Sequence, residues 1–198
     1  MTLRTDLNLI AHLVPGDSRV LDLGCGDGAL LQHLIADHGC SGTGVEIDPD
    51  QVLTAILTGV PVMELDLDSD LPMFADGSFD YVVLSRTIQT IRRPAVVLQE
   101  MARIAPRLIV SVPNFGLLQH RLRLLRGRMP MSRQLPYSWY DTPNLRFTTL
   151  VDLEDLFAQL GLVIDQRINL SLAGEPLGKG FRAANLRAGA AVYQLSQR

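Results

Sequence analysis

The stretch VLDLGCGDG, residues 20–28, has three glycines at alternate positions directly after a short apolar run. The apolar run that starts at Arg19 predicts a buried strand, and the spacing of apolar residues from Ala29 to Asp37 predicts a helix after it. Glycine adopts backbone conformations with positive φ and lets a ligand approach the main chain without meeting a Cβ. The stretch therefore predicts an α/β fold with a ligand site at this turn.

Strands and helices alternate on both sides of this turn. A helix is expected before it, over 3–14. After it the pattern predicts strands over 43–47, 60–65, 79–84, 107–112, 162–168 and 190–195, and helices over 49–57, 95–104 and 150–160. An acidic loop over 66–78 separates two of the strands. This order predicts a doubly wound, mostly parallel seven-stranded sheet with helices on both faces.

The composition fits one soluble domain over 1–198. Hydrophobic residues make up 47% of the 198 residues and charged residues 20%. The net charge of −3 gives no overall attraction to nucleic acid or to an anionic membrane, so neither is expected as a partner. Two cysteines form no disulfide framework, and we find neither a signal peptide nor a membrane span, so we expect a cytoplasmic protein.

Two kinds of ligand fit the glycine-rich turn. A dinucleotide fingerprint, G-x-G-x-x-G/A, can be placed on Gly24, Gly26 and Ala29, with Glu46 near the distance of a ribose-binding acid. The pattern D-x-G-x-G-x-G that starts at Asp22 resembles instead the motif of class I S-adenosylmethionine (SAM)-dependent methyltransferases. SAM has no phosphates, and its ammonium group suits a nearby acid. Two strands after the last helix also match that fold, whose final strand is antiparallel, so we interpret the site as a SAM site.

This resemblance implies roles for residues at the ends of the second and third strands. Glu46 would accept hydrogen bonds from both ribose hydroxyls. Asp66 would accept from the adenine amino group, with the backbone N–H of Leu67 beside it. The alternatives are that Glu46 is an exposed strand-end acid and that Asp66, followed by Asp68 and Asp70, belongs to a solvated acidic loop.

The resemblance also implies which residues hold the methionine part of SAM. The backbone at Gly24 and Gly26 would face it, helped by Asp22 directly or through water. The carbonyl around Ser85 would close the site from the fourth strand. Cys25 is interpreted as a small filler of the loop and not as a nucleophile.

Catalytic residues cannot be assigned from the sequence. The four histidines form no cluster with cysteines or paired acids, so no metal is expected. The segment SRTIQ (85–89) is unlike the Asn-Pro-Pro-Tyr box, which argues against methylation of bases or amides. Because the donor sulfonium is already activated, methyl transfer needs little beyond alignment. Whether the chain is an enzyme therefore stays open.

The regular alternation breaks at about 115–148, which we interpret as an insertion that forms a lid or a partner surface. Residues 119–133 contain five arginines and no acid, and Leu118, Leu122 and Leu125 would share one helical face. Two interpretations of this stretch stay open: an amphipathic helix that lies over the site, and a surface that docks a partner. The aromatic cluster of 137–140 either anchors the lid by packing or walls an acceptor pocket or partner surface.

Four longer stretches are more distinctive: SRTIQTIRRPAVVLQEM (85–101), SVPNFG (111–116), RLRLLRGRMP (121–130) and LPYSWYDTPNLRFTTLVDLEDLF (135–157). Together they resemble the methionine-biosynthesis MetW family, and the likeness covers nearly the whole chain. It implies a methyltransferase-like protein that supports homoserine O-acyltransferase, with methyl transfer to a small molecule as the alternative. Two positions depart from the family, Arg86 where Gln is usual and Arg146 where His is frequent.

Overall fold

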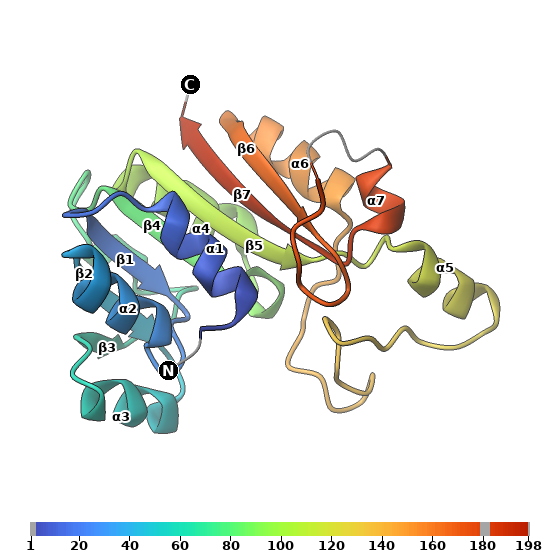
Figure 1. Cartoon of the computed structure of the whole chain (residues 1–198), viewed down its shortest axis with the longest axis horizontal. Coiled ribbons are helices and arrows are strands. Elements are labelled where there is room, and N and C mark those ends of the chain that lie inside the picture. Colours follow the sequence, from blue (N-terminus) through green and yellow to red (C-terminus); the bar gives the residue numbers. More distant parts are fainter. Residues whose placement is uncertain (1–2, 179–182, 198) are drawn as a thin grey trace.

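A computed structural model describes residues 3–178 and 183–197 (Figure 1). Seven strands are formed by β1 (Arg19–Leu23), β2 (Ser41–Glu46), β3 (Val62–Glu64), β4 (Tyr81–Ser85), β5 (Arg107–Pro113), β6 (Leu162–Leu170) and β7 (Ala190–Gln197). The α-helices are α1 (Thr5–Leu13), α2 (Ala29–His38), α3 (Pro49–Leu57), α4 (Pro94–Ile104), α5 (Leu118–Leu125), α6 (Leu150–Gln159) and α7 (Ala184–Arg187). Two 3-10 helices are η1 (Leu71–Met73) and η2 (Ile88–Thr90).

The strands form one sheet in the order β3-β2-β1-β4-β5-β7-β6. The first five strands of the chain pair in parallel, and β7 lies antiparallel between β5 and β6. β2 and β3 lie on one side of β1, whereas β4 and β5 lie on the other, so the order of strands reverses at β1. A ligand site is expected at such a switch point, beyond the carboxyl ends of the strands. The predicted fold is confirmed, including the antiparallel last strand.

Helices cover both faces of the sheet because its central strands are apolar on both sides. One buried cluster joins α1, α2 and α3 to one face, through residues such as Ile10, Leu34 and Ala55. The other joins α4 and α6 to the opposite face, through residues such as Val97 and Phe157. Side chains alternate along β1, so Asp22 shares the face of Val20, which is the face that α1 and α2 cover.

The structure differs from the sequence expectation in several short elements. β3 is only three residues long, and Asp66 therefore lies two residues beyond its end instead of ending it. Leu65 still donates its N–H to the Glu46 carbonyl at 3.0 Å, which holds Asp66 beside β2. The acidic loop contains η1, and α7 precedes the last strand; both are too short to give a periodic apolar pattern.

The segment between β5 and α6 leaves the sheet at the carboxyl end of β5 and extends to one side of the molecule, with α5 at its outer part (Figure 1). It spans 114–149, close to the predicted insertion, and α5 is its only helix among the described residues. Across 3–178 and 183–197, no helix is both long enough and apolar enough to cross a membrane.

Candidate functional site

A cavity of about 320 Å³ lies beyond the carboxyl ends of β1, β2 and β4. Four of the predicted site residues line it: Gly24, Glu46, Asp66 and Leu67. The remaining lining includes apolar side chains and residues that follow β4, and it is completed by Val45, Ile47, Leu65, Asp68, Arg86, Thr87, Thr90, Ile91, Arg92 and Leu145. Residues from widely separated parts of the sequence thus meet at the switch point of the sheet.

Glu46 ends β2, and backbone N–H groups hold its carboxylate. Oε2 accepts from Gly26 at 2.9 Å, and Oε1 accepts from Ile47 at 2.8 Å and from Asp48 at 3.1 Å. A carboxylate has about four acceptor positions, so three are in use. One ribose hydroxyl can therefore bind directly, and a second requires that a backbone donor be displaced. These contacts also show that Glu46 is not simply an exposed strand-end acid, because it holds the glycine loop.

Asp22 lies in β1 next to the loop and is only 3% exposed. Burial raises the pKa of its carboxyl to about 7, and the negative charge of Glu46 adds to this shift, whereas Arg4 opposes it. A buried carboxyl of this kind becomes more acidic when a cation approaches, because the cation stabilises its charged form. Asp22 does not line the cavity itself, so it would act on a ligand from beneath the loop.

Gly24 must be glycine for two independent reasons. Its φ is +70°, in the left-handed region, and a Cβ built on it would lie 2.4 Å from Thr87 Oγ1. Thr87 in turn donates its hydroxyl to the Ser85 carbonyl at 3.1 Å. Ser85 itself does not line the cavity, whereas the two residues that follow it, Arg86 and Thr87, do.

The acids of the 66–78 loop have structural partners. Asp68 accepts from the backbone N–H groups of Arg92 at 2.9 Å and Arg93 at 2.8 Å, and Asp70 accepts from the N–H of Asp66 at 2.8 Å. Asp68 thus ties the loop to the segment before α4, whereas the hydrogen bond of Asp70 lies within the loop. Asp66 accepts from Asp68 N–H at 2.9 Å through one oxygen, Oδ1.

Cys25 packs within the glycine loop, and its thiol stays protonated. Burial, together with the charges of Asp22 and Glu46, raises the pKa of the Cys25 thiol far above its usual range, so it is not a thiolate nucleophile. Its sulfur fills the space over Gly44, where an added Cβ would lie 2.5 Å from it. In the described part of the chain we find no group of three or more His, Cys, Asp or Glu arranged to hold a metal.

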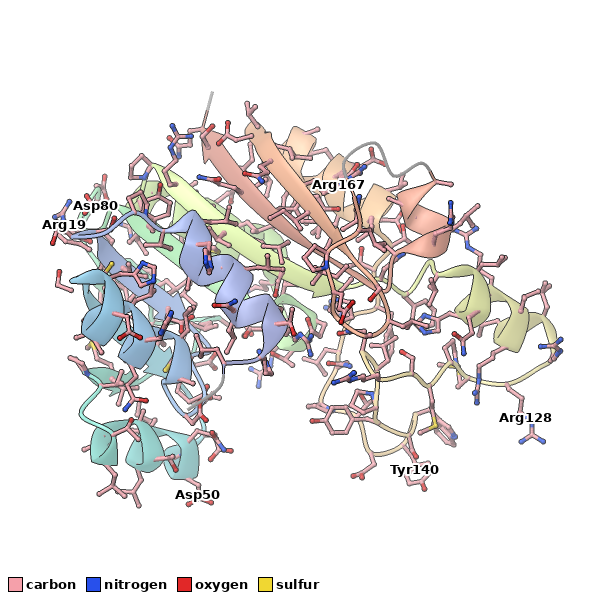
Figure 2. All side chains as sticks on the ribbon, viewed as in Figure 1. Arg19, Asp50, Asp80, Arg128, Tyr140 and Arg167 are labelled. Atoms are coloured by element: carbon pink, nitrogen blue, oxygen red, sulfur yellow. The ribbon has the colours of Figure 1, made fainter. Side chains whose placement is uncertain are left out.

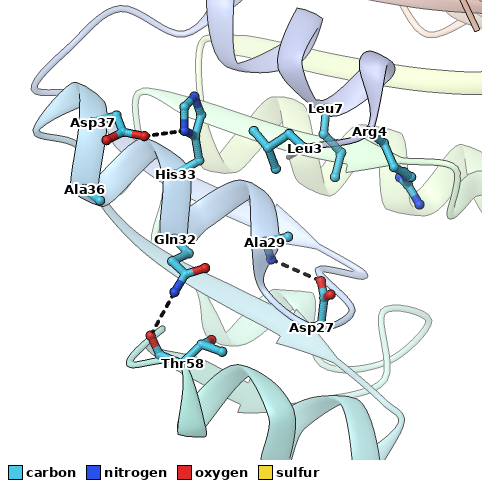
Figure 3. A pocket seen from close by; sticks show the side chains of 10 residues that line it. All are labelled: Leu3, Arg4, Leu7, Asp27, Ala29, Gln32, His33, Ala36, Asp37 and Thr58. Carbon is cyan, nitrogen blue, oxygen red and sulfur yellow. Dashed lines mark hydrogen bonds and ion pairs between the residues drawn. The ribbon is translucent and has the colours of Figure 1, made fainter. Parts of the chain in front are cut away.

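A second hollow, of about 510 Å³, lies between α1 and α2 (Figure 3). Leu3 and Leu7 face it from α1 and the segment before it, and Gln32 and His33 face it from α2. Its lining excludes Glu46 and Asp66. Asp27 lies at its edge, where its carboxylate accepts from the N–H of Ala29 at the start of α2. This hollow is therefore separate from the cavity at the strand ends.

Two residues that line the cavity, Arg86 and Leu145, were not predicted from the sequence as site residues. Arg86 has a φ of +55°, which is uncommon for any residue other than glycine, and its N–H is held by the Ser111 carbonyl at 3.1 Å. Leu145 comes from the insertion, and its N–H donates to the Gln89 carbonyl at 2.8 Å. The positions of both depend on contacts between distant segments. The departure of Arg86 from the family pattern was the only signal in the sequence.

Known structures show which class of fold this is. An S-adenosylmethionine-dependent methyltransferase from Mesorhizobium loti matches with a TM-score of 0.72 at 17% identity, over 98% of each chain. Magnesium protoporphyrin IX methyltransferase from Synechocystis, solved with bound S-adenosylhomocysteine (SAH), matches with a TM-score of 0.69 at 18% identity, over 98% of this chain and 82% of that one. The fold is that of the class I SAM-dependent methyltransferases.

Sequence comparison identifies the family. The model for "Methionine biosynthesis protein MetW" matches residues 4–195, so the chain belongs to the MetW family. The bifunctional methionine biosynthesis protein MetXA/MetW of Rhodopirellula baltica is 37% identical over 178 residues. That alignment covers 85% of this chain but 29% of the relative. The protein is therefore a methyltransferase-like protein associated with methionine biosynthesis, as the sequence predicted.

Proposed function

We propose that the chain binds SAM or SAH in the cavity at the strand ends and supports homoserine O-acyltransferase through the 114–149 segment. The observation that carries the first part is that Gly24, Glu46, Asp66 and Leu67 line one cavity at the switch point. Glu46 and Asp66 would take the ribose and adenine, and Asp22 would stabilise the ammonium of the methionine part. Bound SAM would supply an activated methyl group, and the chain's residues would hold and orient it.

Removing the Glu46 carboxylate should weaken this binding. In Glu46→Ala, SAH affinity should fall by about 1.5–3 kcal/mol, the range for hydrogen bonds to a charged group. The matched control is Glu64→Ala, since Glu64 pairs with Glu46 in the sheet register but is exposed and outside the cavity. Calorimetric titration with SAH measures both variants, and NAD should not compete. An SAH affinity that is the same for Glu46→Ala and the wild type, or tight binding of NAD, would contradict the proposed pocket.

The second part rests on exposed apolar and basic side chains in the 114–149 segment. On α5, Leu118, Leu122 and Leu125 are exposed, and the buried residue of this helix is His120. This exposure favours a partner-docking surface over an amphipathic helix that lies over the site. Trp139 and Tyr140 are 70% and 76% exposed and contact each other edge to face, which favours a partner surface over anchoring of the segment.

These side chains and the nearby arginines form one candidate docking surface, defined by Leu122, Leu125, Arg126, Arg128, Trp139 and Tyr140. Arg128 and Tyr140 point outward from the segment (Figure 2). Exposed aromatics, leucines and arginines together are typical of a protein interface, and the arginines require an acidic partner surface. The relative from Rhodopirellula baltica carries MetXA and MetW in one protein, which supports the acyltransferase as that partner.

The 114–149 segment, which carries the docking surface, also contacts the proposed SAM site through residues outside that surface. Leu145 lines the cavity, and the N–H groups of Leu145 and Arg146 both donate to the Gln89 carbonyl, at 2.8 and 2.9 Å. Arg146 also donates from its guanidinium to the Arg92 carbonyl at 3.0 Å. SAM can bias docking only if it binds the free and docked forms with different affinity, and the acyltransferase would then shift SAM affinity by the same factor.

Substitutions on the docking surface should separate docking from SAM binding. The double variant Leu125→Ser/Trp139→Ala should weaken binding to homoserine O-acyltransferase by at least about 2 kcal/mol, as expected for central interface residues. Its SAH affinity should stay within about twofold of the wild type, because neither side chain lines the cavity. Leu57→Ser on α3 is the control, since Leu57 is 78% exposed and Leu125 83%. Co-purification and a binding titration give both affinities; undiminished docking by the double variant would contradict this surface.

A further inference from the structure

A third cavity, of about 200 Å³, is lined by three arginines and a single acid. Arg4 comes from the turn before α1, Arg86 from the end of β4 and Arg133 from the 114–149 segment, and the acid is Asp6 in α1. Thr5, Gln134 and the turn at Gly174 also belong to the wall. Arg86 also lines the proposed SAM cavity, so the two cavities meet at this side chain.

One carboxylate does not balance the charge of these arginines. Asp6 is only 3% exposed; Arg86 Nε lies 2.7 Å from its Oδ2 as an ion pair, and Arg4 Nε donates to its Oδ1 at 3.3 Å. No ion pair between described residues involves Arg133. Burial lowers the pKa of Arg86, the carboxylate of Asp6 opposes this shift, and the charges of Arg4 and Arg133 add to it. An anion in the cavity would relieve this repulsion.

Anchoring of α1 does not explain the cluster. The Asp6–Arg86 pair alone would tie α1 to the end of β4, and Arg4 and Arg133 then add positive charge without a matching acid. Arg86 also adopts its uncommon positive φ here, and conformations of this kind concentrate at functional sites.

A buried amide adds a second requirement on the ligand. Gln134 is 7% exposed, and its Nε2 donates to the Leu172 carbonyl at 3.3 Å, which fixes the amide orientation. Its Oε1 is buried and has no hydrogen-bond partner among the described residues. A ligand that supplies an N–H or O–H group would satisfy this oxygen.

We propose that the Arg4–Arg86–Arg133 cavity is a subsite for the carboxylate of a small molecule that also carries a hydroxyl or amino donor. The arginine forks would hold the carboxylate, and Gln134 would accept from the donor. Two molecules can supply such a carboxylate beside the SAM cavity: the amino-acid end of SAM itself, or a second molecule of the amino-acid or hydroxy-acid class. This proposal rests on the proposed SAM site only for the first source.

The test uses the full chain and the variant Arg133→Gln, which changes an exposed side chain and should leave the fold intact. Arg107→Gln, at an exposed arginine that begins β5 and lies outside the cavity, is the control. The probes are malate, succinate (the same diacid without a hydroxyl), SAH, and methylthioadenosine, which lacks the amino-acid end of SAH. Calorimetric titrations are made on the unliganded chain and, for the two diacids, also on the SAH complex.

If a second molecule uses the subsite, malate will bind more tightly than succinate, and Arg133→Gln will weaken malate about tenfold or more. If the amino-acid end of SAM uses it, Arg133→Gln will weaken SAH by a similar factor, leave methylthioadenosine unchanged, and malate will compete with SAH. Equal affinities of Arg133→Gln and the wild type for malate and for SAH would overturn the subsite. A wild-type chain that binds no SAH would contradict the SAM site instead, while malate binding to the unliganded chain would still decide the subsite.

Discussion

The substitution Asp22→Asn is expected to make the ligand-free protein more stable at pH 8 and to weaken its binding of SAM. The carboxyl of Asp22 has a pKa of about 7 in the folded protein, raised by burial and by Glu46, against an ordinary value of 3.8. Because this pKa is raised, the contribution of Asp22 to stability is fully present below about pH 4 and is lost progressively as the pH rises to about 7. The loss at pH 8 is roughly 2–4 kcal/mol, and asparagine, which stays neutral, avoids it.

Denaturant unfolding of both proteins at about pH 8 and pH 5 measures this effect. The stability gain of Asp22→Asn should be large at the higher pH and small at the lower one; other titrating groups are common to both proteins and cancel in the difference. A variant that is no more stable than the wild type at pH 8 would show that the ionised Asp22 carboxylate does not destabilise the fold.

Ligand binding should change in the opposite direction. If the charged form of Asp22 stabilises the ammonium of SAH, wild-type affinity should rise roughly five- to tenfold between about pH 6 and pH 7.5, as that carboxyl ionises. Asp22→Asn should bind SAH about 10–100-fold more weakly and lose this pH dependence. Calorimetry at several pH values tests both statements. An SAH affinity of Asp22→Asn equal to that of the wild type would show that Asp22 does not contribute to binding.

The substitution Gly24→Ala is expected to destabilise the fold by about 2–4 kcal/mol and to weaken SAH binding more than about 100-fold. An L-residue at this positive φ costs about 1–2 kcal/mol, and the added Cβ would collide with Thr87, so the loop or the turn after β4 must move. Movement of either one changes the wall of the cavity, since both Gly24 and Thr87 line it.

Gly77→Ala is the matched control for this substitution. Gly77 also has a positive φ, +61°, but nothing lies within 4 Å of an added Cβ. Its loss of stability should be limited to the backbone term, about 1–2 kcal/mol, with SAH affinity unchanged. If thermal unfolding and calorimetry give the same result for Gly24→Ala as for Gly77→Ala, the close approach of Gly24 to Thr87 does not matter for the site.

Most of the fold could be predicted because its signals are local. Short stretches of sequence show the alternation of elements and the glycine turn after β1. The D-x-G-x-G-x-G motif resembles that of the class I methyltransferases, and this resemblance predicted the antiparallel β7. The bounds of β3 were harder to predict, since a three-residue strand has too few residues to show alternation.

The site was predicted in part for the same reason. Residues at strand ends, such as Glu46, follow from the order of the sheet. Arg86 could not be placed, because its contact with Asp6 joins residues far apart in the sequence. The spacing of leucines in α5 indicated an apolar face but could not show whether the rest of the chain covers it. That exposed face carries part of the proposed docking surface.

The rate of acyl transfer by purified homoserine O-acyltransferase, measured with and without this chain in the presence of SAM, tests the central claim most directly. The proposed function predicts that the wild-type chain increases the rate and that Leu125→Ser/Trp139→Ala, still able to bind SAH, does not. A rate that is the same with and without the wild-type chain, at concentrations where the chain is saturated with SAM, would contradict it.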